Sequence, residues 1–431
     1  MAKRLKVLMS AYACEPGRSS EPEGGWRWVS QMARFHDVTV VTRANNRGGI
    51  EMGLDSFKGS PPTFIYYDLP RWLVAWKQKG FPVSLYYVLW QAAVRWQLRR
   101  DLHQFDLIHH VTFNSFLFPG FWWFCKPPVL LGGLGGGQVC PWRFLPLFGR
   151  KVFAELFRSF WVLTSCLNPI QHMTYLFASR ILVATADTRK RIPRCYSRKT
   201  QHFLETGFDL ARVPSQLPAA DKSGNRLIWI SHMEKRKALE LTLRAFAQAL
   251  KENGELRLTI VGAGPDQAPM RELADSLGIN HALDWVGRVP LREVLEVIAR
   301  HNMLLFTSVR DTTGNVILEA MAVGVPVITL RHQGAAELTN DETAVRVPVT
   351  SPSQTVTAIG EANHWLAGSA ELRSRLGESG RRRVLELYSW DKQGERMDAI
   401  YREVVRPHRS SSTTRKDSIP SSSPGPHATS R

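Results

Sequence analysis

The stretch that decides the fold is residues 310–327, "RDTTGNVILEAMAVGVPV". It predicts a helix that begins at Gly314 and ends at Gly324, between the apolar strand-like runs "MLLFTS" and "PVITL". The first amide N–H groups of a helix lack partners and attract an anion. Asp311 and Glu319 flank this helix start, and their carboxylates would accept hydrogen bonds from hydroxyl groups. The stretch therefore predicts a site for a phosphate that is joined to sugars.

The same alternation of short apolar runs and helical segments extends in both directions. From residue 226 the strands "RLIWIS", "LRLTIVG" and "LDWVG" alternate with helices over residues 240–251, 266–277 and 291–299. The first half has strands at "LKVLMSAYA", "DVTVVTR", "TFIYYDL", "FDLIHHVTF", "PPVLLGGL" and "RILVATAD", with the first helix starting at Trp26. This alternation predicts α/β structure with parallel sheets. We expect two doubly wound halves that face each other across a cleft.

Composition narrows the partners of the chain. The net charge of +18 and the pI near 10.0 favour a negatively charged partner: nucleic acid, anionic lipid or a phosphorylated small molecule. Five cysteines without a C-x-x-C pair argue against a disulfide framework or a zinc site. The N-terminus enters an apolar strand without a signal-peptide pattern, so we expect a cytoplasmic protein with free thiols.

Further motifs fall at the ends of the predicted strands, where open α/β sheets bind ligands. "SHMEKRKALE" offers His232, Arg236 and Lys237, which could neutralise a diphosphate, although a solvated basic loop is the alternative. "IVGAGPD" does not complete G-x-G-x-x-G, because Gln267 replaces the last glycine, so a tight turn is the better interpretation. "WVGRVP" ends a strand at Gly287, where exposed backbone could pair with a base edge.

Taken together, these motifs carry a resemblance to a known family. "GNVILEAMAVGVPVI", preceded by Asp311, with "SHMEKRKAL", "IVGAGP" and "WVGRVP", resembles the retaining glycosyltransferases of family 4 (glycosyl transferases group 1). The family signature is E-x7-E followed by A-x-A-x-G-x-P-V, and its order and spacing match over residues 226–334. The resemblance implies the GT-B fold, in which two Rossmann-like doubly wound domains face each other across a cleft.

The resemblance also implies a division of the chain. The segment "ETGFDLARVPSQLPAADKSGN" is the best candidate for a linker, and the Ser/Pro-rich tail cannot bury enough surface to order itself. The expected parts are an N-terminal Rossmann-like acceptor domain, a linker, a C-terminal Rossmann-like nucleotide-sugar donor domain, a C-terminal helix that packs back on the N-terminal domain, and a disordered tail: residues 1–205, 206–225, 226–385, 386–405 and 406–431.

Roles for individual donor-binding residues follow from the resemblance. Glu319 would bind the ribose hydroxyls, and Asp311, which stands where the family usually has glutamate, would contact hydroxyls of the donor sugar. Lys237 matches the lysine that neutralises the diphosphate. The family usually has Gly-Arg where this chain has Ser231-His232, so His232 would replace a permanent charge with one that depends on protonation. Arg236 is the expected compensation.

The backbone at the predicted helix start is expected to bind the donor as well. Gly314, Asn315 and Val316 would present amide N–H groups to the phosphate and the sugar. Val289 and its neighbours would face the base.

The first half contributes fewer expected site residues. Gly24 and Gly25 would lie between the first strand and helix and approach the diphosphate, as a glycine pair does in the family, or form a plain loop. His109 and His110 could bind a metal, but adjacent residues of a strand point to opposite faces. A histidine packed beneath the sheet is the ordinary alternative. The resemblance places a histidine at the sugar centre, favouring His109 and then His110, which join Lys237 and Asp311 as the expected catalytic residues.

No D-x-D motif occurs, so we expect catalysis without a metal and with no cofactor besides the nucleotide-sugar substrate. Segments such as "RWLVAWKQKGFPVSLYYVLWQAAVRWQLRR" and "WRFLPLFGRKVFAELFRSFW" mix aromatic and basic residues, as interfacial segments do on anionic bilayers. Helix–sheet packing explains such aromatics equally well. Membrane contact would suit a lipid-linked acceptor and a peripheral position at the inner face of the membrane.

We therefore expect a retaining glycosyltransferase that acts on a glycan or lipid-linked glycan, in the biosynthesis of cell-surface polysaccharide. A nucleotide-sugar 2-epimerase on the same fold would turn over the donor with no acceptor present. A nucleic-acid binder is disfavoured, because the basic residues are scattered and the aromatics do not form the pattern of a known RNA module.

Overall fold

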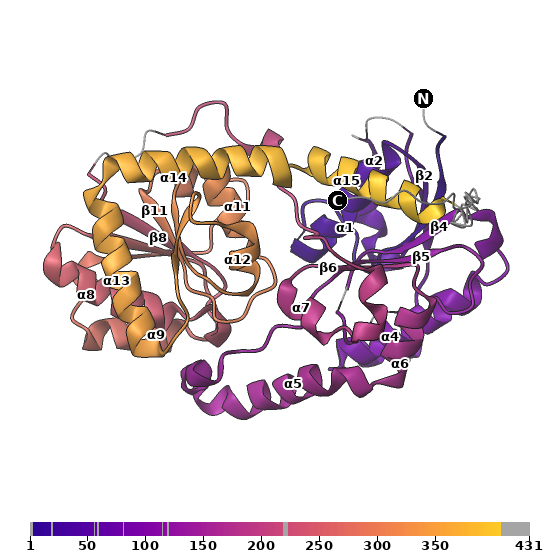
Figure 1. Ribbon diagram of the computed structural model, residues 1–431, viewed down its shortest axis with the longest axis horizontal. Coiled ribbons are helices and arrows are strands. Elements are labelled where there is room, and N and C mark those ends of the chain that lie inside the picture. Colours follow the sequence, from indigo (N-terminus) through magenta and orange to yellow (C-terminus); the bar gives the residue numbers. More distant parts are fainter. Residues whose placement is uncertain are drawn as a thin grey trace, which may run out of the picture.

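The computed structural model describes residues 3–18, 20–55, 57, 60–80, 82–113, 115–118, 120–218 and 223–406. Its two parallel sheets lie in separate halves of the molecule, one on each side in Figure 1. The expected tail lies outside the described residues from position 407 onwards.

The sheet of the N-terminal half has seven strands in the order β3-β2-β1-β4-β5-β6-β7. All its pairings are parallel, as expected for a doubly wound sheet in which helices connect successive strands. The strands are β1 (Lys6–Ser10), β2 (Asp37–Thr42), β3 (Thr63–Tyr66), β4 (Leu107–His110), β5 (Val129–Leu134), β6 (Arg180–Val183) and β7 (Thr200–His202).

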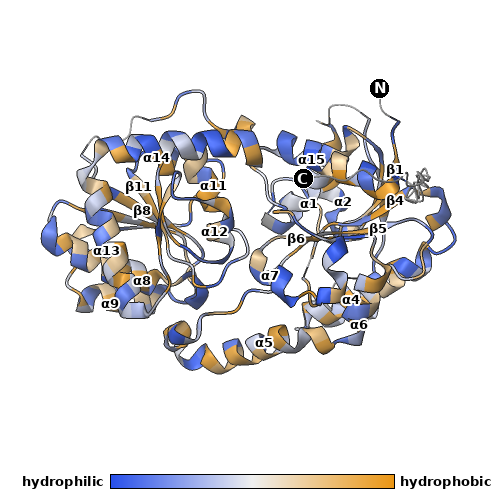
Figure 2. Cartoon of the chain, viewed as in Figure 1, coloured by the Kyte–Doolittle hydropathy of each residue, from blue (hydrophilic) through white to orange (hydrophobic). Residues whose placement is uncertain are grey.

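The sheet of the C-terminal half has six parallel strands in the order β10-β9-β8-β11-β12-β13. The central strand β11 is buried along its whole length, and Figure 2 shows the strands of both sheets as apolar cores between mixed helices. The prediction of two Rossmann-like doubly wound domains is confirmed. The strands are β8 (Arg226–Ile230), β9 (Arg257–Val261), β10 (Leu283–Gly287), β11 (Met303–Phe306), β12 (Val327–Leu330) and β13 (Ala344–Val347).

Helices of the N-terminal half differ from the expectation at one place. The first helix begins at Ser20 rather than at Trp26, and Glu21 and Glu23 occupy its first turn, where carboxylates favour the helix dipole. The helices are α1 (Ser20–Ala33), α2 (Arg47–Asp55), α3 (Arg71–Gln78), α4 (Val83–Gln97), α5 (Val152–Thr164), α6 (Pro169–Phe177) and α7 (Ala186–Arg191), with the 3-10 segment η3 (Trp142–Lys151) before α5.

Helices of the C-terminal half follow the periodicity of the sequence closely. They are α8 (Leu239–Glu252), α9 (Gln267–Ser276), α10 (Val294–Ala299), α11 (Asn315–Ala322), α12 (Gln333–Leu338), α13 (Pro352–Gly368), α14 (Ala370–Arg383) and α15 (Trp390–Val405). Among the described residues, no helix combines the length and the apolar character needed to cross a bilayer.

The last helix, α15, returns from the C-terminal half and packs against α1 of the N-terminal half (Figure 1). The rings of Trp28 and Trp390 meet edge to face with their centroids 5.2 Å apart. The Gln393 side-chain amide donates to the backbone carbonyls of Leu204 and Thr206, at 2.9 and 2.6 Å. These contacts tie α15 to α1 and to the segment that joins the two sheets.

Three histidines are buried in the N-terminal half. The His36 ring stacks on Tyr401 of α15, and Nδ1 of His109 lies 2.5 Å from the hydroxyl of the same tyrosine. Nε2 of His110 lies 2.8 Å from the Tyr87 hydroxyl. Burial lowers the pKa of His36 to about 4, although Asp398 opposes the shift, and burial lowers the pKa of His109 to about 3 and that of His110 to about 4.

These lowered pKa values predict that the protein loses stability in mild acid. Below the ordinary pKa of 6.5, the unfolded chain gains protons at these rings and the folded protein does not. Stability therefore falls as the pH falls from 6.5 towards 4, by up to about 1.4 kcal/mol per pH unit for each ring. Thermal unfolding between pH 7.5 and pH 5 measures this slope, which His36→Gln should flatten and the exposed His281→Gln should not. Equal slopes in the wild type and His36→Gln would contradict the assignment.

Candidate active site

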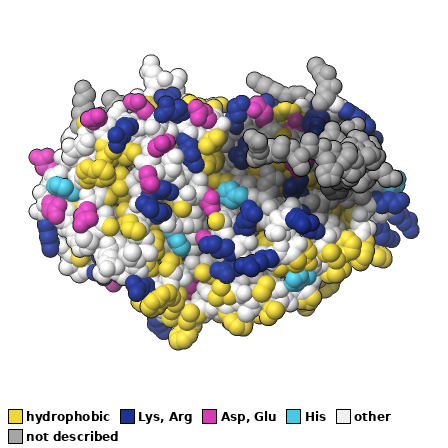
Figure 3. All heavy atoms as spheres, in the orientation of Figure 1, with side chains coloured by type: hydrophobic (Ala, Val, Ile, Leu, Met, Phe, Trp, Pro, Cys, Tyr) yellow, Lys and Arg dark blue, Asp and Glu magenta, His cyan; other side chains and the backbone are white. Residues whose placement is uncertain are grey.

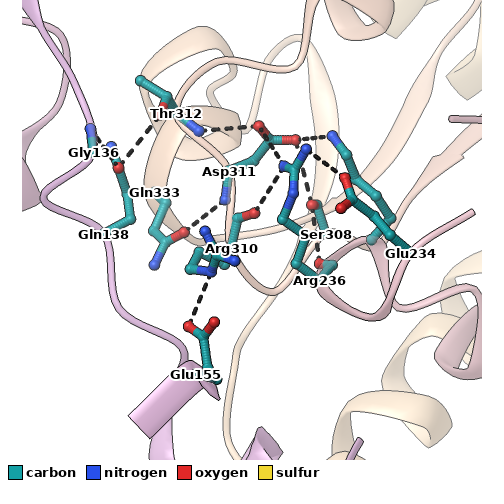
Figure 4. Close-up of polar contacts among 11 residues, drawn as sticks. Gly136, Gln138, Glu155, Glu234, Arg236, Ser308, Arg310, Asp311, Thr312 and Gln333 are labelled. Atoms are coloured by element: carbon teal, nitrogen blue, oxygen red, sulfur yellow. Dashed lines mark hydrogen bonds and ion pairs between the residues drawn. The ribbon is translucent and has the colours of Figure 1, made fainter. Parts of the chain in front are cut away.

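The carboxyl ends of β8 and β11 bring two loops of the C-terminal half together. The strands are parallel neighbours in the sheet, so the chain after Ile230 and the chain after Phe306 emerge side by side. The first loop carries the basic residues before α8, and the second carries Asp311 before α11. Figure 4 shows side chains of both loops converging on Asp311.

Asp311 is the centre of this convergence. The Lys237 ammonium forms an ion pair with its Oδ2, and Nη1 of Arg236 lies 3.4 Å from its Oδ1. The Ser308 hydroxyl donates to Oδ2 at 3.3 Å, and the backbone N–H of Thr312 donates to Oδ1 at 3.0 Å. Two predicted donor-binding cations and the predicted sugar-binding carboxylate therefore lie in one cluster.

Lys237 is held in a partly desolvated position. Its side chain is 13% exposed, and Nζ lies 5.7 Å from the centroid of the Phe306 ring. Burial lowers the pKa of the ammonium, and the neighbouring Asp311 carboxylate opposes this shift. A fixed cation in such surroundings can stabilise negative charge that develops on a departing phosphate.

The start of helix α11 faces the same loops. Gly314 has a φ of 94°, and a Cβ at this position would lie 2.7 Å from the Phe306 ring, so the chain needs glycine here. Within the described residues no side chain caps α11. The side-chain oxygen of Asn315 accepts a hydrogen bond from Thr206 at 2.9 Å, and Val316 packs partly into the core. The first amides of α11 thus stay available to an anion.

Glu319 is buried one helical turn further along, with 8% of its surface exposed. Its partner is Arg212, whose Nη2 lies 3.1 Å from Oε1 and 3.4 Å from the carbonyl oxygen of Leu291. Burial raises the pKa of the Glu319 carboxyl, and Arg212 opposes this shift. The half-buried Val289, two residues before Leu291, packs against the same core cluster as α11. Sequence reasoning missed Arg212, because the segment that joins the two sheets carries no motif.

Two predicted glycines lie inside α1 rather than in a loop before it. A Cβ at Gly25 would lie 2.2 Å from the carbonyl oxygen of Ala13 and 2.8 Å from Cγ2 of Thr112, so Gly25 lets the helix approach the segments that follow β1 and β4. Gly24 has open space around it. His232, at the end of β8, has an exposed side chain.

His109 and His110 are buried within the N-terminal half. The two rings lie on opposite faces of β4, and 1% and 0% of their surfaces are exposed. A Cβ at Gly132 would lie 2.2 Å from Nε2 of His109, which shows how closely the ring is enclosed. Strand alternation points the two rings to opposite faces of β4, where Tyr401 of α15 lies against His109 and Tyr87 of α4 lies against His110; their contact with the donor sugar remains a prediction.

Several interdomain contacts beside Asp311 were not foreseen. Arg310 forms an ion pair with Glu155 of α5, with Nε 2.9 Å from Oε1. Gln333 accepts from the backbone N–H of Asp311 at 2.9 Å and donates to the carbonyl of Val139 at 2.8 Å. The one available signal was Glu155 itself, an acidic residue in the middle of an aromatic-rich segment. In the part of the chain that the structure describes, no three His, Cys, Asp or Glu side chains gather where they could hold a metal ion.

Comparison with known proteins shows which family the motifs of the C-terminal half resemble. Residues 216–383 match the family model described as "Glycosyl transferases group 1". N-acetyl-alpha-D-glucosaminyl L-malate synthase of Bacillus anthracis is 29% identical over 209 residues, which cover 48% of this chain and 53% of that protein. The GDP-mannose-dependent monoacylated alpha-(1-6)-phosphatidylinositol monomannoside mannosyltransferase of Corynebacterium glutamicum is 26% identical over 228 residues, 49% of this chain and 58% of that protein. The chain thus spans about half the length of these curated relatives.

Solved structures resemble most of the chain. HepE from Anabaena, in a complex with UDP, superimposes with a TM-score of 0.61 at 14% identity, covering 93% of this chain and 100% of that one. WaaG, described as a glycosyltransferase involved in lipopolysaccharide biosynthesis, superimposes with a TM-score of 0.58 at 18% identity, covering 92% and 99%. At these identities the likeness establishes the fold.

Proposed function

We propose that this chain is a glycosyltransferase, because residues 216–383 match the glycosyl transferases group 1 family model and the chain has the GT-B fold. It transfers a sugar from a nucleotide-sugar donor to a glycan or lipid-linked glycan, in the biosynthesis of cell-surface polysaccharide. The observation that carries this proposal is the cluster of Lys237, Arg236 and Asp311 beside the uncapped start of α11.

Each donor-side residue has a role in the proposal. Lys237 and Arg236 neutralise the diphosphate, together with the first amides of α11. Asp311 binds hydroxyls of the donor sugar, and Glu319 binds those of the ribose, since a carboxylate accepts hydrogen bonds from adjacent hydroxyls. Lys237 and Arg236 pair with Asp311, and Arg212 pairs with Glu319, so donor binding would exchange these ion pairs for hydroxyl contacts.

The proposed reaction retains the configuration of the transferred sugar and uses no metal. The bond between the anomeric carbon and the phosphate oxygen breaks, and its electron pair leaves with the diphosphate under the charge of Lys237. The acceptor hydroxyl attacks the anomeric carbon from the same face, and its proton passes to the departing phosphate oxygen. Fixed charges stabilise the leaving group without a carboxylate nucleophile.

The acceptor side of the proposal involves an anionic membrane surface. Exposed hydrophobic and basic side chains occur together along the lower edge of the molecule in Figure 3, where Figure 1 places α5. Such a surface suits a lipid-linked acceptor at the inner face of the membrane. The exposed aromatic residues of η3 and α5 are Trp142, Phe153, Phe157, Phe160 and Trp161.

A nucleotide screen tests the donor assignment. We expect one of UDP, GDP and ADP to raise the thermal unfolding temperature, because a ligand at about 100 times its Kd adds about 2.7 kcal/mol of stability. Its nucleotide-sugar should then release the nucleoside diphosphate when acceptor is present. Turnover of the donor alone, followed by NMR, would instead indicate the 2-epimerase, an alternative that the sugar transfer named for the Corynebacterium relative does not favour. The absence of any thermal shift with all three nucleotides would contradict the proposal.

A further inference from the structure

Helix α5 presents an apolar face to solvent. Phe153, Leu156, Phe157, Phe160 and Trp161 recur at spacings of three and four residues, which places them on one side of the helix. Their exposed fractions are 78%, 44%, 65%, 59% and 54%. A continuous apolar face of this kind marks a surface that another phase or molecule covers.

Exposed cations precede α5 in the chain and indicate what covers its apolar face. Arg143, Arg150 and Lys151 precede α5, and their side chains are exposed. Aromatic residues beside cations are complementary to an anionic bilayer, whose headgroups pair with the cations while the rings enter the interface. The occupant is therefore an anionic lipid surface.

On the opposite side of α5 lies a single buried carboxylate. Glu155 is 5% exposed, and its Oε1 lies 2.9 Å from Nε of Arg310 and 3.5 Å from Nη2 of Arg158. A buried charge persists only when it is paired. Arg158 also donates to the backbone carbonyl of Gln138 in the N-terminal half. Glu155 thus joins α5 to the loop before α11.

That loop, residues 307–314, is the donor loop, because it carries Asp311 of the proposed donor site. Arg310 immediately precedes Asp311, and the carbonyl of Arg310 accepts a hydrogen bond from Arg236 at 3.3 Å (Figure 4). Asp311 in turn pairs with both Arg236 and Lys237. A displacement of Glu155 would therefore reach the diphosphate-binding cations through one residue.

The segment before α5 contacts the other side of the same site. Phe144 and Phe148 of η3 are 0% and 4% exposed and belong to one core cluster with Met233 and Ala238. Those two residues bracket Lys237 and its neighbours in the sequence. The η3–α5 segment, residues 142–164, leaves the N-terminal sheet after β5 and thus supports both loops of the donor site.

We propose that Glu155 is a positioning residue that couples membrane contact to donor binding. When the apolar face of α5 enters an anionic bilayer, the position of the helix is fixed, and Glu155 then holds Arg310 and the donor loop in the binding arrangement. This inference rests on the proposed function and adds its regulation: the enzyme binds donor most tightly where its membrane-linked acceptor is found.

The test uses the full-length chain and the nucleoside diphosphate that the screen identifies. Calorimetric titration compares its Kd without vesicles, with phosphatidylcholine vesicles, and with vesicles that also contain phosphatidylglycerol. We expect the anionic vesicles to tighten nucleotide binding several-fold in the wild type. Glu155→Gln should sediment with the vesicles as the wild type does, but anionic vesicles should not change its affinity for the nucleotide. In Glu155→Asp the vesicles should tighten nucleotide binding, by less than in the wild type.

Matched variants separate coupling from folding and from general charge effects. Glu51→Gln removes an exposed carboxylate elsewhere in the N-terminal half and should keep the full gain. Phe157→Ser should lose both vesicle binding and the vesicle-induced gain in nucleotide affinity, while its affinity without vesicles stays that of the wild type. Trp365→Ser, on the exposed surface of α13, should keep vesicle binding and the gain in affinity. If Glu155→Gln unfolds, Phe157→Ser and Glu155→Asp carry the test.

Four outcomes would overturn the inference. An undiminished gain in Glu155→Gln, or wild-type protein that binds vesicles with an unchanged nucleotide Kd, rejects the coupling and leaves the proposed transferase standing. Wild-type protein that ignores anionic vesicles does the same. Failure to bind any nucleoside diphosphate rejects both the coupling and the proposed function.

Discussion

Replacing Lys237 by alanine is expected to lower the rate of sugar transfer by about 100- to 1,000-fold, the usual cost of removing one fixed donor from a developing negative charge. Lys237 is the most enclosed of the three cations in its loop, at 13% side-chain exposure, against 28% for Arg236 and 24% for Lys235. The fold should survive, because Arg236 remains 3.4 Å from the Asp311 carboxylate and keeps it paired.

The measurement is the release of nucleoside diphosphate from the identified donor in the presence of acceptor, with circular dichroism to verify the fold. Lys235→Ala is the matched control, since it removes the same charge from the same loop but its ammonium faces Asp266, 3.9 Å away. We expect Lys235→Ala to stay close to the wild-type rate and Lys237→Arg to retain part of it. A Lys237→Ala variant with the wild-type rate would remove the basis of the proposed mechanism.

The second large effect concerns Glu319. Glu319→Gln should weaken binding of the nucleoside diphosphate by about tenfold or more, because hydrogen bonds to a charged group contribute about 1.5–3 kcal/mol. Burial raises the pKa of this carboxyl, so acidification should protonate it at a higher pH than an exposed glutamate. Wild-type affinity for the nucleotide should therefore fall in mild acid, and that of Glu319→Gln should fall less.

Arg212→Gln distinguishes ribose binding from a structural role of the ion pair. If Glu319 mainly anchors Arg212, both variants should lose nucleotide affinity equally. If Glu319 binds the ribose, Arg212→Gln removes a competitor for the carboxylate, and its affinity should equal or exceed that of the wild type. Isothermal titration at pH 7.5 and at pH 5.5 measures all three proteins, and equal losses in the two variants would count against the ribose assignment.

Much of the fold follows from local signals in the sequence. Apolar runs of four to six residues alternate with helical segments, and the structure has parallel strands at these runs, such as β8 and β11. The motif residues Lys237 and Asp311 follow these two strands. Their contact follows from the pairing of the strands, because the carboxyl ends of parallel neighbours meet at one edge of a sheet.

The extent of α1 and the burial of the histidines required the packed structure. In "EPEGGWRW" the glycines suggested a loop, but favourable charges in the first turn and the close approach of Gly25 to Ala13 extend the helix to Ser20. The sequence left open whether His109 lies at the sugar centre or packs beneath the sheet, and the contact of its ring with Tyr401 of α15 appears only in the packed structure. The alternation of side chains along a strand predicts that they point to two faces of the sheet, but it does not predict which elements cover each face.

By itself, then, the sequence determined the two doubly wound sheets and the residues that gather at the ends of β8 and β11, because both depend on periodicity and on short-range chain geometry. Only the tertiary structure decided that Arg212 pairs with Glu319 and that Glu155 of α5 pairs with Arg310. These partners are distant in the chain, and their ion pairs depend on how the two halves and the η3–α5 segment pack together, which no local pattern of residues encodes.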